Sequence, residues 1–284
     1  MERTSTENLR RKMFPVLKWA GGKTQLLEHI KRNMPAEYGN YYEPFLGGGA
    51  VLFGVSPARA FVNDVNIQLV NLYRQLKNAP DSVIEKVNEM DAISCTKEFY
   101  YASRQKFNQK ISNGEFDAEC AALMIWINKH CFNGLYRVNS KGFFNVPYNN
   151  KVNGKSIDES NIRAISEYLK MSEVSITCLD FEEACRKVKA SDFVYFDSPY
   201  VPESLTASFT DYTREGFSFA DHERLASLFK RLDHKGAKVM LSNNDVPLVR
   251  SLYKGYHFHY LDVKRLINRD SNKRTGKEVL ITNY

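Results

Sequence analysis

The sequence predicts an α/β protein built on a doubly wound, mostly parallel sheet with an inserted, mainly helical segment. Short apolar runs bounded by turn residues recur along the chain, as the buried strands of a parallel sheet require. Stretches with helical periodicity lie between several of these runs, which is typical of a doubly wound fold. The expected strands are Tyr41–Phe45, Ala60–Asp64, Val174–Cys178, Phe193–Phe196, Lys238–Asn243 and Val279–Thr282.

Helical periodicity supports this alternation and also marks where it is interrupted. The helices expected beside the strands are Gln25–Asn33, Ile67–Lys77 and Asp221–Leu232. After Lys77 the strand signal stops, and it resumes only at Val174. We therefore expect the sheet domain in two parts, residues 1–77 and 166–284, with residues 78–165 as an inserted domain.

Length and composition are those of a folded protein, and the basic net charge favours a polyanionic partner, although many basic proteins bind none. A chain of 284 residues can hold one large α/β domain or a core domain with an insert. Its 43% hydrophobic and 26% charged residues exclude a disordered chain. The net charge of +7 is concentrated in residues 264–277, where Lys273 and Arg274 are candidate phosphate contacts. A solvated loop is the alternative for this stretch.

The cysteines and the lack of long apolar segments indicate in which compartment the protein resides. The five cysteines form no Cys-x-x-Cys pair, which predicts reduced structural thiols and no metal site. The N-terminal residues lack the apolar core of a signal peptide, and no run of ~18 apolar residues occurs. We therefore expect a cytoplasmic protein without a membrane segment. The sequence gives no prediction of oligomeric state.

A glycine-rich turn follows the first predicted strand, in Glu43-Pro44-Phe45-Leu46-Gly47-Gly48-Gly49. Glycines at a strand-to-helix turn permit positive φ and let a ligand approach the backbone closely. The Gly-x-Gly-x-x-Gly spacing of dinucleotide sites is absent, because Ala50-Val51-Leu52 follows. An uncharged part of a cofactor therefore fits this turn better than a pyrophosphate. A glycine turn without any ligand is the alternative.

Asp64 ends the second predicted strand, after Phe61-Val62-Asn63. An acidic residue at this position of a nucleotide-binding sheet accepts hydrogen bonds from ribose hydroxyls. The alternative is that Asp64 is the N-cap of the helix expected at Ile67–Lys77.

The strand Phe193–Phe196 leads directly into Asp197-Ser198-Pro199-Tyr200. Pro199 biases Ser198 toward an extended backbone, so that the Asp197 carboxylate and the Ser198 carbonyl can converge beyond the strand end. Two such acceptors suit an amine, and Tyr200 offers a flat face for a planar base. An Asx-type turn with a buried tyrosine is the alternative.

These motifs and three further segments occur one after another along the chain. The segments are Val16-Leu17-Lys18-Trp19-Ala20-Gly21-Gly22-Lys23, the glycine turn, Asn133-Gly134-Leu135-Tyr136-Arg137, Phe144-Asn145-Val146-Pro147 and Asp197-Ser198-Pro199-Tyr200. From about Val16 to the C-terminus the chain resembles Dam-type DNA adenine methyltransferases of the α group. The resemblance implies a Rossmann-like methyltransferase sheet and a target recognition domain in the insertion. By composition alone, residues 133–155 are equally typical of an ordinary β-hairpin.

The resemblance also assigns roles. It implies S-adenosyl-L-methionine as cofactor, double-stranded DNA as partner, and base flipping with direct methyl transfer to adenine N6 without a metal. The catalytic residues would be Asp197, Ser198, Pro199 and Tyr200. The implied cofactor contacts are Trp19, Lys23, Phe45, Gly47, Gly49, Asp64, Asp180 and Asp197. Matches to positions that read GATC are Lys18, Leu135, Arg137 and Pro147, and association with the nucleoid would follow from DNA binding.

Two departures from the family pattern keep alternatives open. Ser198 replaces the first proline of Asp-Pro-Pro-Tyr, and Asn149-Asn150-Lys151 replaces a downstream Gly-Arg-Tyr that contributes to specificity. The alternatives are a DNA-binding protein with weak or no catalysis, or the same chemistry at another recognition sequence. A nucleotide-dependent oxidoreductase on a similar sheet is disfavoured by the missing Gly-x-Gly-x-x-Gly. A restriction–modification, phage or solitary role would each fit the sequence.

Overall fold

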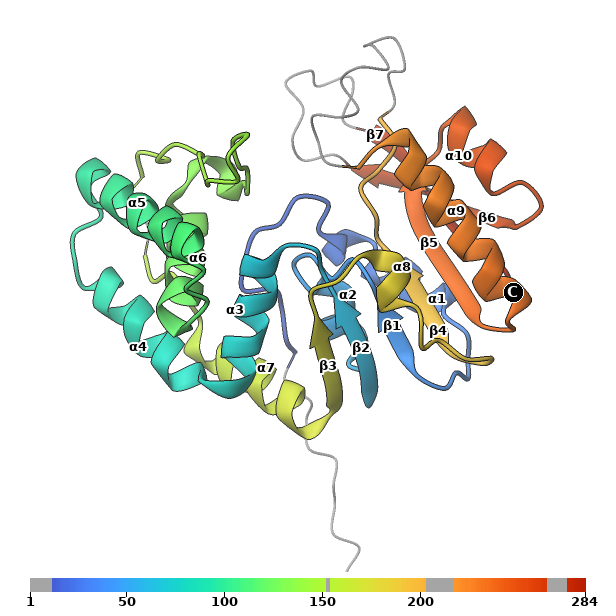
Figure 1. Ribbon diagram of the computed structural model, residues 1–284, viewed down its shortest axis with the longest axis horizontal. Helices are drawn as coiled ribbons and strands as arrows, with labels where there is room; N and C mark the ends of the chain where they lie inside the picture. Colours follow the sequence, from blue (N-terminus) through green and yellow to red (C-terminus); the bar gives the residue numbers. More distant parts are fainter. Residues whose placement is uncertain (1–11, 152–153, 203–216, 265–274) are drawn as a thin grey trace, which may run out of the picture. The chain divides into compact units, whose positions relative to one another are not determined.

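The computed structural model describes residues 12–151, 154–202, 217–264 and 275–284. The chain divides into two compact units (Figure 1). The helical unit comprises Met1–Ala20, Gly48–Ser56 and Asn71–Met171. The sheet unit comprises Gly21–Gly47, Pro57–Val70 and Ser172–Tyr284.

The described part of the sheet unit contains a seven-stranded sheet in the order β3-β2-β1-β4-β5-β7-β6 (Figure 1). The strands from β3 to β5 in this order are parallel, and β7 is antiparallel to both β5 and β6. Their bounds are β1 Tyr41–Glu43, β2 Arg59–Asn63, β3 Glu173–Thr177, β4 Phe193–Phe196, β5 Lys238–Asn244, β6 His257–Lys264 and β7 Thr275–Thr282. The prediction of a mostly parallel, Rossmann-like α/β sheet is confirmed.

All six predicted strands form, and β4 has the predicted bounds. The sequence prediction missed β6, which lies at an edge of the described sheet and pairs there with β7 alone. An edge strand needs few buried side chains, so the polar sequence HFHYLDVK gives no apolar run to detect. Pairing with β6 also extends β7 back to Thr275, ahead of the predicted start at Val279.

One face of the sheet packs on α9 (Phe219–His234). Alternate residues of β4, β5 and β7 point into this core, as strand geometry requires. The side chains that form it include Val194, Phe196, Val239, Leu241, Val279, Ile281, Leu225 and Phe229. By the same alternation Tyr195 of β4 and Ser242 of β5 lie on the opposite face, where both are completely buried.

The helices differ from the predictions mainly at their starts. Ser218 and Asp221 form a capping box, so α9 begins before the predicted Asp221. The predicted helix Gln25–Asn33 is a 3-10 turn followed by a shorter α-helix. The other helices of the sheet unit are η1 Lys23–Gln25, α1 Leu27–Asn33, α8 Phe181–Ala184 and α10 Pro247–Leu252. Helix α3, Ile67–Asn78, begins in the sheet unit and ends in the helical unit.

Helices make up most of the helical unit, which confirms the mainly helical insertion. Its elements are α2 Ala50–Val55, α4 Pro80–Asp91, α5 Lys97–Asn113, α6 Ala118–His130, η2 Phe132–Gly134 and α7 Glu159–Met171. The central helix α6 is buried along nearly its whole length. Its Trp126 packs against Phe99 and His130 and donates a hydrogen bond to Asp91 Oδ1 at 3.0 Å.

The described residues contain neither a membrane-spanning helix nor a cluster of metal-binding side chains. None of the described helices is long and apolar enough to cross a bilayer. No group of three His, Cys, Asp or Glu side chains arranged to hold a metal ion was found among the same residues. All five cysteines are free, as predicted.

Candidate active site

The turn after β1 depends on glycine at three consecutive positions. Gly47 and Gly49 have φ angles of +51° and +72°, which glycine adopts without strain. At Gly48 a Cβ atom would come within 3.1 Å of the Trp19 Cβ. The turn therefore presents backbone rather than side chains.

Asp64 connects this turn with the turn that follows β2. Its Oδ2 accepts the Gly47 N–H at 2.9 Å, and its Oδ1 accepts the Asn66 N–H at 2.9 Å. Burial raises the pKa of the Asp64 carboxyl, and these two N–H groups oppose the shift. The alternative that Asp64 caps α3 is wrong, because Asn66 Oδ1 accepts the N–H groups of Gln68 and Leu69. Each Asp64 oxygen retains lone-pair capacity for a hydroxyl donor.

Asn63 is a positioning residue that the sequence prediction missed. Its buried amide donates to the carbonyls of Pro44 and Leu179 at 3.1 and 2.9 Å. Its Oδ1 accepts the Leu179 N–H and the Thr177 hydroxyl, both at 2.8 Å. Asn63 thus joins the ends of β1, β2 and β3. Such long-range contacts leave no local signal in the sequence.

Phe45 and Asp180 lie beside an aromatic cluster. The ring of Phe45 stacks on Phe181 with centroids 5.4 Å apart, and it forms a T-shaped pair with Phe217 with centroids 5.9 Å apart. Asp180 directly precedes Phe181 and caps α8 by accepting the Glu182 N–H at 2.9 Å. The carboxylate of Asp180 is therefore held next to an apolar surface.

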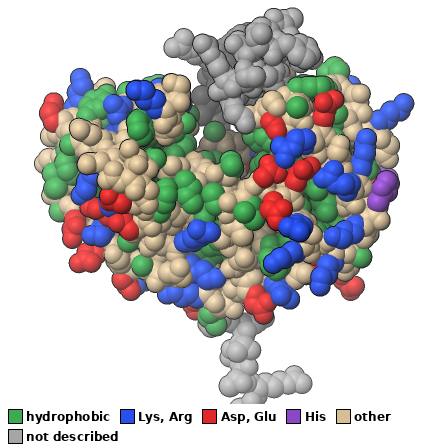
Figure 2. Space-filling view, viewed as in Figure 1, with side chains coloured by type: hydrophobic (Ala, Val, Ile, Leu, Met, Phe, Trp, Pro, Cys, Tyr) green, Lys and Arg blue, Asp and Glu red, His purple; other side chains and the backbone are tan. Residues whose placement is uncertain are grey.

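The same carboxylate belongs to a charged network on the surface. Arg224 Nη2 lies 2.9 Å from Asp180 Oδ1, and its guanidinium lies over the Phe181 ring. Arg231 pairs with Glu182 nearby. In Figure 2, Lys/Arg and Asp/Glu side chains are interspersed over the sheet unit. Both hydrogen bonds of the Asp180 carboxylate, from the Glu182 N–H and from Arg224, are accepted by Oδ1. Its other oxygen, Oδ2, has no hydrogen bond within the described ranges.

Asp197 follows β4 directly and forms the centre of a polar cluster. Lys23 Nζ lies 2.9 Å from its Oδ1, with the lysine and aspartate side chains 5% and 21% exposed. The Ser242 hydroxyl donates to the same oxygen at 3.1 Å. Burial raises the pKa of the Asp197 carboxyl, whereas Lys23 and Ser242 oppose that shift. The alternative of an Asx-type turn is wrong, because the described hydrogen bonds of this carboxylate are to side chains.

Tyr200 and Ser198 complete the tetrapeptide beyond the strand. The Tyr200 hydroxyl donates to Glu278 Oε2 at 2.9 Å, and Lys23 Nζ lies 4.6 Å from the ring centroid. Ser198 is buried, and its hydroxyl has no hydrogen-bond partner among the described residues. The roles of Ser242 and Glu278 were missed in the sequence, because both strands lie far along the chain from Asp197.

The segment that carries the predicted GATC contacts Leu135, Arg137 and Pro147 is an irregular antiparallel loop, residues 131–148, of the helical unit. Isolated bridges join Cys131 to Tyr148 and Val138 to Phe144. We call this segment the 131–148 hairpin. Both bridges are antiparallel, but the described residues of this segment form no β-strand, and the alternative of a hairpin without special function stays a prediction.

Arg137 projects from this hairpin and is held by the residue opposite. Its Nε donates to Asn145 Oδ1 at 2.7 Å, and its Nη2 donates to the Asn145 carbonyl at 3.4 Å. The Asn145 N–H in turn donates to the Arg137 carbonyl at 3.1 Å. Within the described residues, the Nη1 group makes no hydrogen bond. One edge of the exposed guanidinium is thus fixed and the other is open.

Leu135 and Pro147 lie on the same hairpin. Leu135 is half-buried, and Pro147 is exposed while its carbonyl accepts the Phe132 N–H at 2.8 Å. Phe132 and Val138 are also exposed, at 51% and 42%. The hairpin therefore presents apolar side chains around Arg137.

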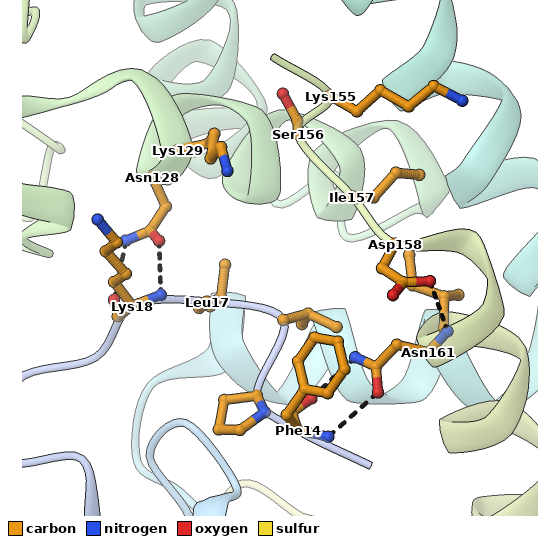
Figure 3. Close-up of a pocket in the computed structure, with 13 residues that line it drawn as sticks. Phe14, Leu17, Lys18, Asn128, Lys129, Lys155, Ser156, Ile157, Asp158 and Asn161 are labelled. Carbon is orange, nitrogen blue, oxygen red and sulfur yellow. Dashed lines mark hydrogen bonds between the residues drawn. The ribbon is translucent and has the colours of Figure 1, made fainter. Parts of the chain in front are cut away.

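Lys18 is anchored to α6 through its backbone. Asn128 accepts the Lys18 N–H at 2.9 Å and donates to the Lys18 carbonyl at 3.0 Å (Figure 3). A cavity of about 340 Å³ lies beside this anchor, and Lys18, Lys129 and Lys155 are among its lining residues. This cavity is formed within the helical unit.

The remaining predicted residues fall into two groups. Trp19 belongs to the helical unit, where its ring lies 5.0 Å from that of Tyr136 on the 131–148 hairpin. Lys273 and Arg274 lie outside the described residues, so their predicted phosphate contacts remain a prediction.

Comparison with known proteins gives a consistent identity. The profile of D12 class N6 adenine-specific DNA methyltransferases matches residues 19–267. A type II methyltransferase of Lactococcus lactis subsp. cremoris, M1.LlaDCHI, is 44% identical over 95% of both chains. The type II methyltransferase M.MjaIII of Methanocaldococcus jannaschii is also 44% identical, over 95% of this chain and 99% of its own. A DNA adenine methylase of Vibrio cholerae is 32% identical over 95% and 96%. The chain therefore belongs to the D12 class of N6 adenine-specific DNA methyltransferases.

Proposed function

We propose that this enzyme uses S-adenosyl-L-methionine to methylate the adenine of GATC in double-stranded DNA, after rotating that base out of the helix. The observation that carries the proposal is the arrangement at the end of β4. Asp197, Ser198 and Tyr200 follow one another there, with one Asp197 oxygen already held by Lys23 and Ser242. The second oxygen, Oδ2, has no hydrogen bond in the described part of the chain.

The chemistry of adenine explains why two acceptors are needed. The N6 lone pair is delocalised into the ring, so the amine is a poor nucleophile. In the proposed complex one N6 hydrogen is donated to Asp197 Oδ2 and the other to the Ser198 carbonyl. These bonds favour a more tetrahedral nitrogen whose lone pair is directed at the methyl group. Replacement of proline by Ser198 keeps this carbonyl, so the departure from the family tetrapeptide is compatible with catalysis.

The residues of the sheet unit fit the proposed cofactor. S-adenosyl-L-methionine supplies an electrophilic methyl group on a sulfonium centre when it is bound. Asp64 retains lone pairs for ribose hydroxyls beside a turn of bare backbone. Phe45, half-buried and stacked on Phe181, offers an apolar surface for an adenine, and Asp180 Oδ2 can accept its amine. Trp19, Lys23, Gly47 and Gly49 stay predicted contacts on the strength of the resemblance.

Tyr200 is the proposed stacking surface for the flipped base. Its hydroxyl is fixed by Glu278, which restricts rotation of the ring. One face of the ring is covered by Lys23 Nζ at 4.6 Å. We therefore assign the stacked adenine to the opposite face, where stacking contributes about 1–3 kcal/mol.

Sequence recognition is assigned to the inserted domain, residues 78–165, through Arg137. Asn145 holds the Nε edge of the guanidinium, which leaves the terminal edge for guanine O6 and N7. The nearby Leu135 and Pro147 suit contact with a thymine methyl group. Lys18 lines a cavity together with Lys129, Lys155 and Asp158, and its ammonium group would suit a phosphate or an acceptor on a base edge. A purely phosphate-contacting Arg137 is the competing assignment.

The biological setting is proposed from the relatives. Two of them, 44% identical over nearly the whole chain, are named type II methyltransferases. This favours a modification role paired with a restriction enzyme over a solitary role.

The direct test is transfer of a labelled methyl group from S-adenosyl-L-methionine to duplexes that contain GATC or a GATC with one substituted base. We expect N6-methyladenine on GATC only, and no incorporation by Asp197→Ala. Binding of GATC duplexes without methyl transfer would instead support the DNA-binding alternative. A thermal shift with NAD but none with S-adenosylhomocysteine would favour the oxidoreductase alternative.

A further inference from the structure

Behind the proposed catalytic carboxylate lies a chain of buried hydroxyl groups. The Ser242 Oγ is 3.1 Å from Asp197 Oδ1 and 3.1 Å from the Tyr195 hydroxyl. Tyr195 and Ser242 are completely buried and lie on the face of the sheet opposite α9. They come from neighbouring strands, because β4 pairs with β5 in parallel.

The direction of these hydrogen bonds follows from the groups involved. An ionised carboxylate can only accept, so Ser242 must use its single hydrogen to donate to Asp197. The competing acceptor, the Phe196 carbonyl, is more distant at 3.5 Å. Ser242 can then only accept from Tyr195. Burial raises the pKa of Tyr195 well above its usual value, so this phenol keeps its proton as a donor.

We infer that Ser242, supported by Tyr195, is a positioning residue that orients and ionises the Asp197 carboxylate for methyl transfer. This inference rests on the proposed function, which makes Asp197 the acceptor of the N6 amine. Ser242 and Lys23 both contact Oδ1, from different elements of the sheet unit. Two donors on one oxygen fix the plane of the carboxylate and direct the remaining hydrogen-bonding capacity to Oδ2.

The groups around Asp197 determine the pKa of its carboxyl. Lys23 approaches from η1, and Ser242 approaches from β5. Tyr195, Tyr200, Glu43 and Glu278 are the other titratable groups of this buried cluster, and they come from β4, the tetrapeptide, β1 and β7. Burial raises the pKa of Asp197, whereas the Lys23 charge and the Ser242 hydrogen bond lower it. Loss of the Ser242 hydroxyl should therefore make the carboxylate harder to ionise.

The test compares Ser242→Ala and Tyr195→Phe with wild type, using single-turnover methyl transfer across a pH series. We expect Ser242→Ala to lower kcat about tenfold, a smaller loss than that expected for Asp197→Ala. The acid limb of its kcat profile should move to higher pH, because ionisation of Asp197 has lost a supporting donor. Tyr195→Phe should shift the profile in the same direction by a smaller amount. KM for S-adenosyl-L-methionine and for DNA should stay near the wild-type values.

Two further variants separate positioning from mere packing. Tyr256→Phe removes a phenol hydroxyl that donates to Asp233 of α9 at 3.1 Å, on the other face of the sheet and outside the Ser242 chain. It should leave kcat and the acid limb at wild-type values. Ser242→Thr keeps the hydroxyl, and it should restore the pH profile that Ser242→Ala loses, even if the added methyl group lowers the melting temperature.

The inference is overturned if Asp197→Ala is inactive while Ser242→Ala and Tyr195→Phe keep the wild-type kcat and acid limb. If Ser242→Ala does not fold, the other two variants still test the inference. Tyr195→Phe keeps nearly the native side-chain volume, and Ser242→Thr keeps the hydroxyl. Full activity in Asp197→Ala would instead refute the proposed function itself, whatever the Ser242 variants show.

Discussion

The end of β4 and the 131–148 hairpin are built in opposite ways. At the end of β4 the Asp197 and Tyr200 side chains are largely buried, and they are held by side chains from η1, β5 and β7. Around Arg137 the side chains are exposed, and one neighbour, Asn145, supplies the described contacts. A rigid, desolvated site suits one chemical step on any adenine, whereas an exposed and separately held side chain suits sequence discrimination. Variants in the two regions should therefore fail in different ways.

The largest effect is expected for Asp197→Ala. Methyl transfer should fall by about a hundredfold or more, because a preorganised acceptor at the reacting nitrogen is lost. Removal also leaves the buried Lys23 ammonium without its carboxylate, so a lower melting temperature is expected. Single-turnover rates and DNA-binding titrations of the folded variant provide the measurement. Near-wild-type turnover would refute the catalytic assignment.

A smaller and sequence-dependent effect is expected for Arg137→Ala. If the guanidinium contacts guanine, the variant should lose roughly 1–3 kcal/mol on GATC and discriminate less against a substituted first base. Methylation rates on GATC and first-base variants at two salt concentrations measure this. A uniform loss on all sequences with a shallower salt dependence would show a phosphate contact instead.

A matched control for Arg137 exists in the same unit. Arg163 is also an exposed arginine, but it pairs with Asp81 on α4, away from the hairpin. Arg163→Ala should leave both the rate and the sequence preference unchanged.

The two regions should also differ in pH dependence. In the proposed mechanism the ionised Asp197 carboxylate accepts the amine, and burial raises its pKa above the usual 3.8. Activity on every sequence should therefore fall as the pH drops through this raised pKa. Discrimination between GATC and first-base variants should not change over the same range, because arginine stays charged. A change in discrimination that follows the loss of rate would contradict the separation of the two regions.

The smallest effect is expected for Ser198→Pro, which restores the family tetrapeptide. The Ser198 hydroxyl has no partner in the described residues, and its carbonyl is kept by proline. The variant should retain its activity, with a stability gain of about 0.4–1 kcal/mol if the backbone suits proline. Thermal unfolding and methyl-transfer rates measure this. A folded but inactive variant would show that the hydroxyl or the N–H of Ser198 has a function.

Local sequence predicted the parts of the site that depend on one segment. β4 was predicted with its observed bounds because all four of its residues are apolar and buried, and Asp197 follows it directly. The glycine turn was recognisable because its backbone requires glycine at positions with positive φ. The alternation of strands and helices was enough to predict the fold class.

The parts that could not be predicted depend on contacts between distant segments. Asn63 joins three strand ends, and Ser242 and Glu278 reach the tetrapeptide from β5 and β7. Their residue types carry no pattern that distinguishes them from other polar residues in strands. The ion pair of Lys23 with Asp197 likewise depends on tertiary packing. Edge strand β6 was missed because its exposure removes the apolar signal.

The most direct test of the account is a map of modified adenines. Unmethylated genomic DNA would be treated with wild type, Asp197→Ala and Arg137→Ala, and then read by single-molecule sequencing. We expect N6-methyladenine at GATC for wild type and none at any site for Asp197→Ala. For Arg137→Ala we expect weaker methylation that extends to sites with a different first base. Persistent methylation by Asp197→Ala, or an equal loss at every site in Arg137→Ala, would contradict the proposed roles of these two residues.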